Sequence, residues 1–592
     1  MNPLARRRHR TLVATLLCVA IAARESAAQQ RPAAAAPLKL AVVISIDGLS
    51  WEWLSHYKPW YVSGFKRLLE EGHVEANAKY RHINTETAPG HAALATGAPP
   101  RVTGVVSNSW WEERGGRMLS VWSSAQPVPE GTAGAVRGAL QGPGNLRVPT
   151  LGDRLVEARR GARVVSLSGK DRSAALLAGR HRGHVAYWWD QRNGRFMTSA
   201  AYDTRGGAGD VGREIVERFN ARAGARLPGR FGVLWSRLGG PAPERPEPLP
   251  TPVPELGKYQ LPQQGIGFDH DLARDERGYF SSLYDSPFID ELLADLALEF
   301  ISNAELGLGR GAVPDLLALS FSGNDTVSHA YGRESEEALD ALRRLDRQLG
   351  RVLDALGRVQ PKGSVVVALS ADHGFPPIPE VHRRDTRAPA GRLLYKDVSP
   401  LTYYGPTFRD LLNRGLAGEL CLDSAARPIL DGEGWSLVYD RPALPLKTVA
   451  GPCGAAGRDV TRADLDATVP RVVLRLFGNE IERVLMVSLR ERWPQELPAV
   501  EFVLNDYDAE RSGDVFLVPR PNVLLHWDPA RGSHHGSHYD YDTHVPMIFW
   551  GGPFRPGVSN AETTPYDVAP TLAALLEVKL PDATGRSRAP AP

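Results

Sequence analysis

The stretch Leu38-Lys39-Leu40-Ala41-Val42-Val43-Ile44-Ser45-Ile46 is an apolar run that ends at Asp47 and Gly48. A short run of this kind is typical of a strand that is buried on both faces in a parallel sheet. Ligands of open parallel sheets bind just beyond the carboxyl ends of the strands. The sequence therefore predicts that Asp47 lies at the edge of the sheet where a ligand is expected.

Four further apolar runs predict the other core strands, at residues 162–167, 315–321, 364–369 and 545–550. Helical periodicity separates them, at residues 65–71, 151–160, 289–306, 334–359 and 564–576. This alternation predicts an α/β fold in which a mostly parallel sheet has helices on both faces. Polar residues follow the first three of these runs, and a histidine cluster at residues 534–538 precedes the last.

Two segments interrupt the alternation. Residues 205–285 contain the proline-rich stretch Pro241–Pro262, and we expect an insertion or loop region there. Residues 379–523 have no such strand–helix rhythm, and we expect them to form an inserted cap segment. The core then consists of residues 38–204, 286–378 and 524–585.

The first 28 residues have the pattern of a secretory signal. Basic residues at positions 6–10 precede the apolar stretch Thr11–Ala23, and Ser26-Ala27-Ala28 provides a small-residue cleavage site. The apolar stretch is too short to span a bilayer comfortably, and no later stretch qualifies. We therefore expect a periplasmic or secreted protein that has no membrane segment after removal of the signal.

Two cysteines, Cys421 and Cys453, remain after the signal is removed. In an oxidising compartment they most simply form one disulfide, although free thiols or zinc ligation are alternatives. The net charge of +2 gives no sign of nucleic-acid binding. The sequence leaves the oligomeric state open.

The segment His82-Ile83-Asn84-Thr85-Glu86-Thr87-Ala88-Pro89-Gly90-His91 leads into a short helix that is predicted to extend to Gly97. Pro89 suits the first turn of that helix, and Thr87 has the expected cap position. A hydroxyl at the cap faces free N–H groups and the positive end of the helix dipole, which attract phosphate. Thr87 is therefore a candidate functional residue, although a threonine that only caps the helix gives the same pattern.

Carboxylates and imidazoles are the other candidates for chemistry. Asp325 and His329 are four residues apart and would share one face of a helical turn. Asp372 and His373 are adjacent at a predicted strand end, Asp47 adds a carboxylate, and the histidine cluster adds imidazoles. Oxygen and nitrogen donors without thiolate suit Zn²⁺, with Mn²⁺ or Mg²⁺ less favoured. Each pair alone also fits a helix cap or a turn, but together they predict a metal site.

These motifs together resemble the alkaline phosphatase superfamily, most closely its bacterial secreted branch of phosphomonoesterases with a threonine nucleophile. That branch is related to the nucleotide pyrophosphatases and phosphodiesterases. The matching motifs are Asp47, Thr87-Ala88-Pro89-Gly90-His91, Asp325-x-x-x-His329, Asp372-His373-Gly374 and His535-Gly536. The resemblance implies an alkaline-phosphatase-like three-layer αβα sandwich with inserted cap segments.

The resemblance also implies a site with two Zn²⁺ ions. One zinc would be held by Asp325, His329 and His535. The other would be held by Asp47, Asp372, His373 and the oxygen of Thr87. His535 is favoured because a glycine follows it, and its neighbours His534, His538 and His544 stay open as alternatives. Thr87 would be phosphorylated, and water would then release the phosphate.

Lys170 and Arg172 lie between two apolar segments, so they do not simply belong to a solvated helix face. In the resembled branch, a lysine and an arginine at this spacing contact phosphate oxygens, and Asn108 matches a further donor. A cation about 4 Å from an anionic oxygen contributes up to ~4 kcal/mol at an effective dielectric constant of ~20. We therefore predict an exported, zinc-dependent alkaline phosphatase that acts on small dianionic phosphate monoesters.

The main alternative is a nucleotide pyrophosphatase or phosphodiesterase with the same metals and the same Thr87. A second is a non-catalytic, exported zinc-binding protein that keeps only the fold. Sulfatase chemistry is less compatible, because it requires a Cys or Ser that becomes formylglycine, and a threonine cannot give that product. No sequence feature selects mutase chemistry.

Overall fold

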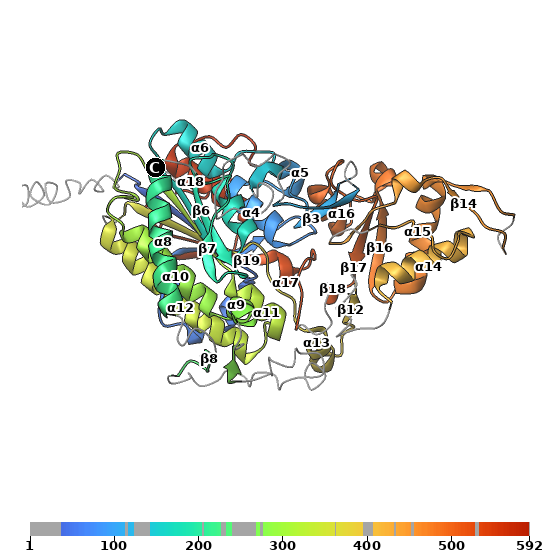
Figure 1. Ribbon diagram of the computed structural model, residues 1–592, viewed down its shortest axis with the longest axis horizontal. Helices are drawn as coiled ribbons and strands as arrows, with labels where there is room; N and C mark the ends of the chain where they lie inside the picture. Colours follow the sequence, from blue (N-terminus) through green and yellow to red (C-terminus); the bar gives the residue numbers. More distant parts are fainter. Residues whose placement is uncertain are drawn as a thin grey trace, which may run out of the picture. The chain divides into compact units, whose positions relative to one another are not determined.

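Figure 1 shows a computed structural model of the protein, which describes residues 37–112, 116–122, 142–203, 206–226, 233–239, 268–272, 276–360, 363–394, 406–430, 434–451, 455–526 and 532–590. The predicted signal at residues 1–28, the stretch Pro241–Pro262 and Cys453 lie outside the described residues. Among the residues that are described, no helix has both the length and the apolar composition needed to cross a membrane.

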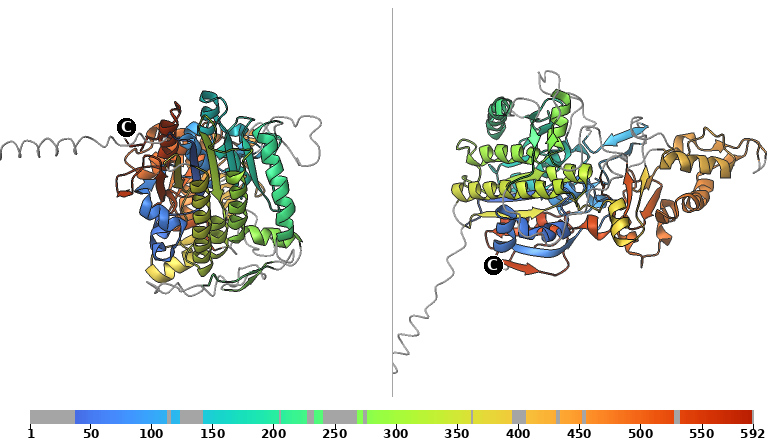
Figure 2. Two further views of the ribbon diagram at one scale, coloured as in Figure 1. Left: turned by 90° about the vertical axis from the view of Figure 1, so that its left-hand side faces the viewer. Right: turned by 90° about the horizontal axis from the view of Figure 1, so that it is seen from below.

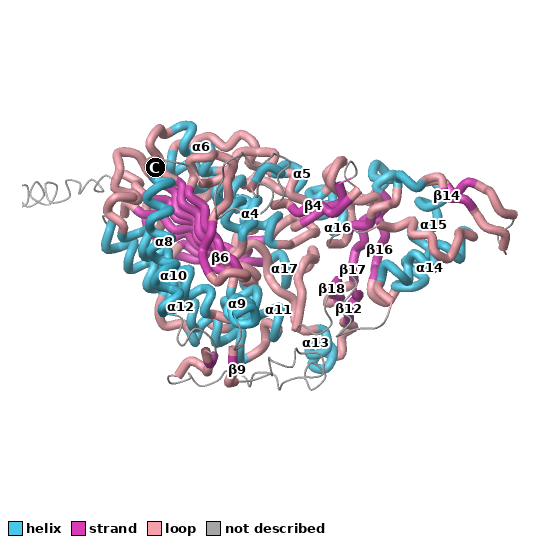
Figure 3. Tube along the Cα trace, in the orientation of Figure 1, coloured by secondary structure: helices cyan, strands magenta, loops and turns pink. Residues whose placement is uncertain are grey.

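A nine-stranded sheet organises the core (Figure 3). Its strands, in the order in which they lie side by side, are β20 (Gly557–Ser559), β2 (His73–Lys79), β19 (His544–Gly551), β11 (Val365–Ser370), β1 (Leu40–Ile46), β10 (Asp315–Phe321), β5 (Val164–Ser168), β6 (Val185–Asp190) and β7 (Arg195–Met197). The five strands from β11 to β6 are parallel to one another. The predicted mostly parallel sheet is therefore confirmed.

Helices cover both faces of this sheet (Figures 1 and 2). One face carries α2 (Trp51–His56), α3 (Gly64–Glu71), α8 (Ala208–Arg226), α10 (Phe288–Ser302) and α12 (Glu336–Val359). The other carries α4 (Thr87–Thr96), α6 (Leu151–Ala158), α7 (Asp171–Ala178) and α18 (Val568–Leu576). The structure thus has the predicted three-layer αβα arrangement.

The alternation of side chains along β1 explains the two layers. Leu40, Val42 and Ile44 join the hydrophobic cluster of one face, whereas Ala41 and Val43 join the cluster of the other. All five side chains are at most 5% exposed. Full burial of a Leu, Ile or Val side chain contributes about 1.5–3 kcal/mol. The apolar run therefore stabilises the sheet against helices on both sides.

Small polar residues mark the carboxyl ends of the four central parallel strands. Ser168, Ser320, Ser45 and Ser370 stand opposite one another on β5, β10, β1 and β11, and each is at most 1% exposed. Because these strands are in register, the segments that follow the serines leave the sheet at one common edge. This is the edge where ligands of such sheets bind.

Strand β19 runs against the parallel strands. Met547 pairs with Ser370 and Gly551 pairs with Val366, so the amino end of β19 lies at the carboxyl end of β11. The loop before β19 therefore reaches the same edge as the segments that follow the parallel strands. This direction explains how a histidine cluster ahead of a strand meets donors that come after strands.

Helix α4 begins one residue earlier than the sequence predicted. Thr87 is its first residue, and Glu86, with an extended backbone, is the N-cap. Thr87 is already inside the helix because the carbonyl oxygen of Glu86 accepts a hydrogen bond from the backbone N–H of Gly90, at 3.0 Å. The predicted cap position of Thr87 is therefore corrected to the first helical position.

A second hydrophobic cluster lies within residues 393–523, with the single addition of Ile83. Helices α14 (Phe408–Leu420), α15 (Arg462–Phe477) and α16 (Pro498–Asp506) pack there with a sheet of β13 (Ser436–Leu437), β17 (Val515–Pro519) and β16 (Ile481–Met486). Cys421, the residue directly after α14, is disulfide-bonded, in agreement with the predicted bridge.

The remaining helices are α5 (Pro100–Thr103), α9 (Glu276–Tyr284), α11 (Gly323–Tyr331), α13 (Pro379–Thr386) and α17 (Asp540–Thr543). The remaining strands form short pairs: β3 (Ser109–Glu112) with β4 (Arg117–Ser120), β8 (Leu234–Trp235) with β9 (His270–Asp271), β12 (Gly391–Leu394) with β18 (Val523–His526), and β14 (Leu446–Lys447) with β15 (Asp459–Val460).

Gly90 allows α4 to lie against the segment that follows β11. A Cβ atom at this position would be 2.1 Å from the backbone oxygen of Asp372. We expect Gly90→Ala to force the two segments apart and to lower the free energy of unfolding by about 1–3 kcal/mol, measured by chemical denaturation.

The matched control is Gly357→Ala in α12, where an added Cβ meets no atom within 4 Å. That variant should stabilise the protein by up to about 1 kcal/mol, because alanine favours a helix more than glycine does. A Gly90→Ala variant as stable as the parent would contradict the close contact.

Candidate active site

The hydroxyl of Thr87 lies where two cationic side chains converge. Thr87 starts α4, and Lys170 and Arg172 follow β5 at the start of α7. The distance from Thr87 Oγ1 is 3.4 Å to Lys170 Nζ and 3.3 Å to Arg172 Nη2. Thr87 and Lys170 are 1% and 5% exposed. The fold thus brings one buried hydroxyl and two cations from distant segments into contact.

Asp47, Asp372 and His373 form a first group of possible metal donors. Asp47 follows β1, and the other two residues follow β11, its neighbour in the sheet. His373 Nε2 is 3.4 Å from Asp47 Oδ1 and 3.5 Å from Asp372 Oδ2. All three residues are fully buried.

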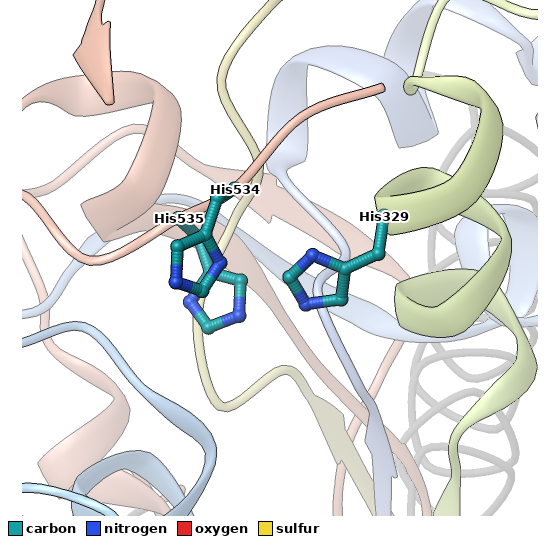
Figure 4. Close-up of side chains that lie close together, drawn as sticks. All are labelled: His329, His534 and His535. Atoms are coloured by element: carbon teal, nitrogen blue, oxygen red, sulfur yellow. The ribbon is translucent and has the colours of Figure 1, made fainter. Parts of the chain in front are cut away.

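Asp325, His329 and His535 form a second group. Asp325 and His329 lie one turn apart on α11, as their spacing predicted, with 3.3 Å between His329 Nε2 and Asp325 Oδ1. His535 Nε2 is 3.5 Å from the same oxygen. Figure 4 shows His329 on its helix, facing His534 and His535 on the loop before β19. The imidazole of His535 also stacks on that of His373, with 3.5 Å between the ring centroids, which joins the two groups.

The structure reduces the number of neighbouring histidines that could act as the metal ligand in place of His535. Among the described residues, neither His538 nor His544 belongs to a cluster of possible metal ligands, and the Nε2 atom of His544 is hydrogen-bonded to the backbone oxygen of Ala76. His534 forms a further group with His329 and His535, because their donor atoms lie within 4.8 Å of one another. His534 is therefore the one remaining alternative.

The donor groups fit a metal ion. The buried atoms of these groups that have no hydrogen-bond partner include Asp47 Oδ1, Asp325 Oδ1, Asp372 Oδ2 and His373 Nε2. Buried polar atoms are normally hydrogen-bonded, so a coordinated cation accounts for these exceptions. The donor atoms of Asp47, Asp372 and His373 lie within 4.8 Å of one another, as do those of Asp325, His373 and His535. Carboxylate oxygens and imidazole nitrogens form a donor set that Zn²⁺ accepts.

The ammonium group of Lys170 lies between the two donor groups. Its Nζ atom is 2.6 Å from Asp47 Oδ2 and 2.5 Å from Asp325 Oδ2. Burial alone would lower the pKa of Lys170, but the carboxylates of Asp325 and Asp47 outweigh burial and hold the pKa above its usual value. Burial also opposes the charge of Arg172, whose pKa is nevertheless raised, chiefly by Asp171. Both side chains therefore stay cationic at neutral pH.

Glu86 orients Asn108, a contact that the sequence analysis missed. Its carboxylate accepts hydrogen bonds from Ser107 Oγ at 2.7 Å and from the backbone N–H of Asn108 at 2.8 Å. Asn108 Oδ1 in turn accepts a hydrogen bond from the backbone N–H of Ala88 at 3.0 Å. The amide nitrogen of Asn108 is then the side-chain donor available to the cavity that Asn108 lines.

His91 is a second residue to which the sequence analysis assigned no role. It is fully buried one turn after Thr87, with Nδ1 at 2.8 Å from the backbone oxygen of Thr87 and Nε2 at 2.8 Å from Ser320 Oγ. Its Nδ1 is also 3.2 Å from Asp372 Oδ2. In the sequence, the signal for this contact was the position of His91 four residues after Thr87, which places both residues on one face of a helix. His91 connects the start of α4 to the first donor group.

A cavity of about 330 Å³ joins Thr87, Asn108 and the two cations to Asp325, His329 and His535. Two aromatic residues outside the predicted core also line it: Tyr284, which ends α9, and Trp435, which precedes β13. The backbone N–H of Trp435 donates a hydrogen bond to Asn84 Oδ1 at 3.3 Å. The sequence analysis missed both, because single aromatic residues in irregular segments carry no distinguishing pattern.

The sheet edge thus gathers every residue that the sequence predicted for the site: Asp47, Thr87, Asn108, Lys170, Arg172, Asp325, His329, Asp372, His373 and His535. This αβα architecture agrees with the one that the resemblance to the alkaline phosphatase superfamily implies.

Comparison with known proteins gives the family. The family model described as type I phosphodiesterase / nucleotide pyrophosphatase matches residues 41–538. The chain belongs to this family, and the predicted membership of the alkaline phosphatase superfamily is confirmed. The predicted class of enzyme, a phosphoric ester hydrolase, is confirmed as well.

Two relatives align over 96% of this chain and 96% of their own length. Alkaline phosphatase PhoV of Synechococcus elongatus is 28% identical, and alkaline phosphatase PafA of Elizabethkingia meningoseptica is 27% identical. A crystal structure of wild-type PafA has a TM-score of 0.74 at 24% identity and covers 94% of this chain and 99% of that chain. This likeness confirms the fold.

Metal analysis separates His535 from His534. We expect His535→Ala to reduce the bound divalent metal, measured by elemental mass spectrometry of the purified protein, because a zinc site that loses one of its few ligands binds more weakly. His534→Ala should retain the metal, and His538→Ala is the control outside the donor groups. Loss of metal from His534→Ala together with full retention by His535→Ala would contradict the assignment.

Proposed function

We propose that the protein is an exported alkaline phosphatase that hydrolyses small phosphate monoesters through Thr87, with two Zn²⁺ ions as cofactors. The convergence of Lys170 and Arg172 on the Thr87 hydroxyl, at 3.4 and 3.3 Å, carries this proposal. Two relatives that align over 96% of both chains are named alkaline phosphatases, which supports it. The pattern of residues 1–28 supports a periplasmic or secreted location.

The proposed reaction has two displacements. Thr87 Oγ1 forms a bond to phosphorus, its proton is released, and the ester P–O bond breaks as the leaving oxygen departs with its electron pair and takes up a proton. Water then forms a P–O bond to the phosphothreonine, the bond to Oγ1 breaks, and Thr87 regains its proton. The products are the alcohol and inorganic phosphate.

Zn²⁺ supplies Lewis-acid stabilisation of developing negative charge and lowers the pKa of a hydroxyl or a water. We assign one ion to Asp325, His329 and His535. We assign the other to Asp47, Asp372, His373 and the oxygen of Thr87.

The chain's own polar groups bind the phosphoryl oxygens in this proposal. Lys170 and Arg172 reach Thr87 Oγ1 within 3.4 Å and therefore also reach the oxygens of a phosphoryl group at that atom. The side-chain oxygen of Asn108 accepts a hydrogen bond from the backbone N–H of Ala88, so its side-chain N–H group remains as the donor for a phosphoryl oxygen. A dianionic monoester gains more from two cations than a diester with one charge fewer, by up to ~4 kcal/mol for each close contact at an effective dielectric constant of ~20.

A diesterase that uses the same residues is the second candidate, because the matching family model describes phosphodiesterases and nucleotide pyrophosphatases. The comparison of 4-nitrophenyl phosphate with its methyl diester separates the two. We expect kcat/KM for the monoester to exceed that for the diester by about 100-fold or more, which corresponds to ~2.7 kcal/mol. A ratio near one, or a preference for the diester, would favour the second candidate.

Removing both cations tests the origin of that preference. Lys170→Ala/Arg172→Ala should lower kcat/KM for the monoester by about 100-fold or more and the diester value far less, because the diester carries one charge fewer. Thr87→Ala is the reference that should abolish turnover of both substrates. Equal losses of monoester and diester turnover in the double variant would count against the assigned role of the two cations.

A double-mutant cycle tests whether Glu86 acts through Asn108. Glu86→Ala should lower kcat/KM for the monoester by about 10-fold, the size expected when a hydrogen bond to a charged group is lost. Glu86→Gln keeps an acceptor and should recover part of this loss. In an Asn108→Ala background, Glu86→Ala should have little further effect, because the two act as one unit. Full additivity would contradict the positioning role.

Turnover itself tests the alternative of a non-catalytic zinc-binding protein. Under the present proposal, the metal-loaded parent hydrolyses 4-nitrophenyl phosphate, whereas Thr87→Ala binds the same metal without turnover. A metal-loaded parent with no activity on either ester would favour the non-catalytic alternative.

A further inference from the structure

A second cavity, of about 490 Å³, adjoins the one that contains Thr87. The two cavities share the side chains of Lys170, Arg172, Gln191 and Tyr284 as lining. The second cavity extends along the turn between β6 and β7, with Arg192 in the turn and Arg195 at the start of β7. Because β6 is parallel to β5, with Trp188 opposite Ser168, this turn lies at the same sheet edge as Lys170.

The acidic residues of this cavity are engaged by local donors. One carboxylate oxygen of Asp190 accepts a hydrogen bond from the backbone N–H of Arg192 at 3.0 Å, and the other accepts one from the side chain of Asn193. Asp171 Oδ1 accepts a hydrogen bond from the backbone N–H of Arg172 at 2.7 Å. These contacts hold the two carboxylates in their turns, and among the described residues neither carboxylate forms an ion pair with Arg192 or Arg195.

Unlike these two carboxylates, the guanidinium groups of Arg192 and Arg195 are not engaged by neighbouring side chains in the described part of the chain. Both residues are exposed, and neither side chain forms an ion pair or hydrogen bond with any part of the chain that the structure describes. Each offers up to five N–H donors in a planar fork that matches phosphate or carboxylate oxygens. Arg192 and Arg195 are therefore available to bind an anionic ligand, and they lie next to the two cations that we assign to the reacting phosphoryl group.

Of the three aromatic residues that line the cavity, the two tryptophans offer little surface for an apolar ligand, and Tyr284 is partly exposed. Trp188 and Trp189 are only 3% and 4% exposed, since both pack into hydrophobic clusters on either face of the sheet. Most of the other lining side chains are charged or polar: those of lysine, arginine, aspartate, asparagine and glutamine. The surface thus favours an anionic, polar group over a stacked base or aryl ring.

We propose that this cavity binds a second anionic group of the substrate, so that the enzyme prefers small phosphate monoesters that carry a second phosphate. The proposal rests on the proposed function, because it assigns the reacting phosphate to Thr87 and the distal phosphate to Arg192 and Arg195. The shared wall of Lys170, Arg172, Gln191 and Tyr284 means that a short linker joins the two positions.

A matched pair of substrates tests the proposal: propane-1,3-diol bisphosphate and 3-hydroxypropyl phosphate. They have the same linker and differ only in the distal phosphate. Initial phosphate release should give a higher kcat/KM for the bisphosphate, after correction for its two equivalent phosphates. Arg192→Ala/Arg195→Ala should lower this ratio by about 5-fold or more, as expected for the loss of two solvent-accessible ion pairs, while kcat/KM for the monophosphate changes little.

The control is Arg160→Ala/Arg182→Ala. These exposed arginines precede β5 and β6, at the opposite edge of the sheet, and their removal changes the net charge equally. This variant should keep the parental ratio, which separates local binding from the general field of the protein. The proposal is overturned if Arg192→Ala/Arg195→Ala keeps the parental ratio or lowers turnover of both substrates equally. Failure to hydrolyse either substrate would instead overturn the proposed function.

Discussion

The in-register pairing of four parallel strands is the constraint on which the site depends. Ser168, Ser320, Ser45 and Ser370 form one row across β5, β10, β1 and β11, and the polar segments of the site begin within five residues of this row. A slip of one residue in any strand would turn its side chains to the other face and move the following segment by about 3.3 Å. Close packing opposes such a slip, because both faces of these strands are buried and a slip would put larger side chains of one face where smaller ones of the other face fit.

The small size of the serines has a further consequence. Ser320 Oγ is hydrogen-bonded to Nε2 of His91. His91 lies between Thr87 and Asp372, on the side of α4 that faces the sheet. Gly90 allows the closest approach of α4 to the backbone of Asp372. A hydroxyl, an imidazole and a carboxylate are thus packed against each other by residues with little or no side-chain bulk.

Charge balance explains why so many ionisable groups can be buried together. The carboxylates of Asp47 and Asp325 are both paired with the ammonium group of Lys170, and the buried carboxylate of Asp372 lies 3.2 Å from Nδ1 of His91. Buried charges require partners, since uncompensated burial is costly. Two divalent ions at the donor groups would leave the site strongly positive, and a dianionic phosphoryl group suits such a site better than a monoanionic one. Under the proposed function, substrate preference and metal binding therefore depend on the same charge balance.

Much of this site was predictable because it follows strands with an unambiguous pattern. Apolar runs located β1, β5, β10 and β11, and the residues after them were Asp47, Lys170, Asp325 and Asp372. The exact start of α4 was missed by one residue, because backbone geometry at Glu86 decides it. Glu86, Tyr284 and Trp435 were also missed, since their contacts depend on tertiary packing between segments with no shared pattern. The choice between His535 and His538 or His544 likewise needed the direction of β19.

The most direct test of the central claim is to identify the group that carries phosphate during turnover. The metal-loaded enzyme can be mixed with 4-nitrophenyl phosphate, quenched in acid within the first turnover and digested for peptide mass spectrometry. The account predicts phosphate on Thr87 in the peptide that contains residues 82–91, and none in the Thr87→Ala variant. Turnover with no phosphorylated peptide, or with phosphate on a different residue, would contradict it.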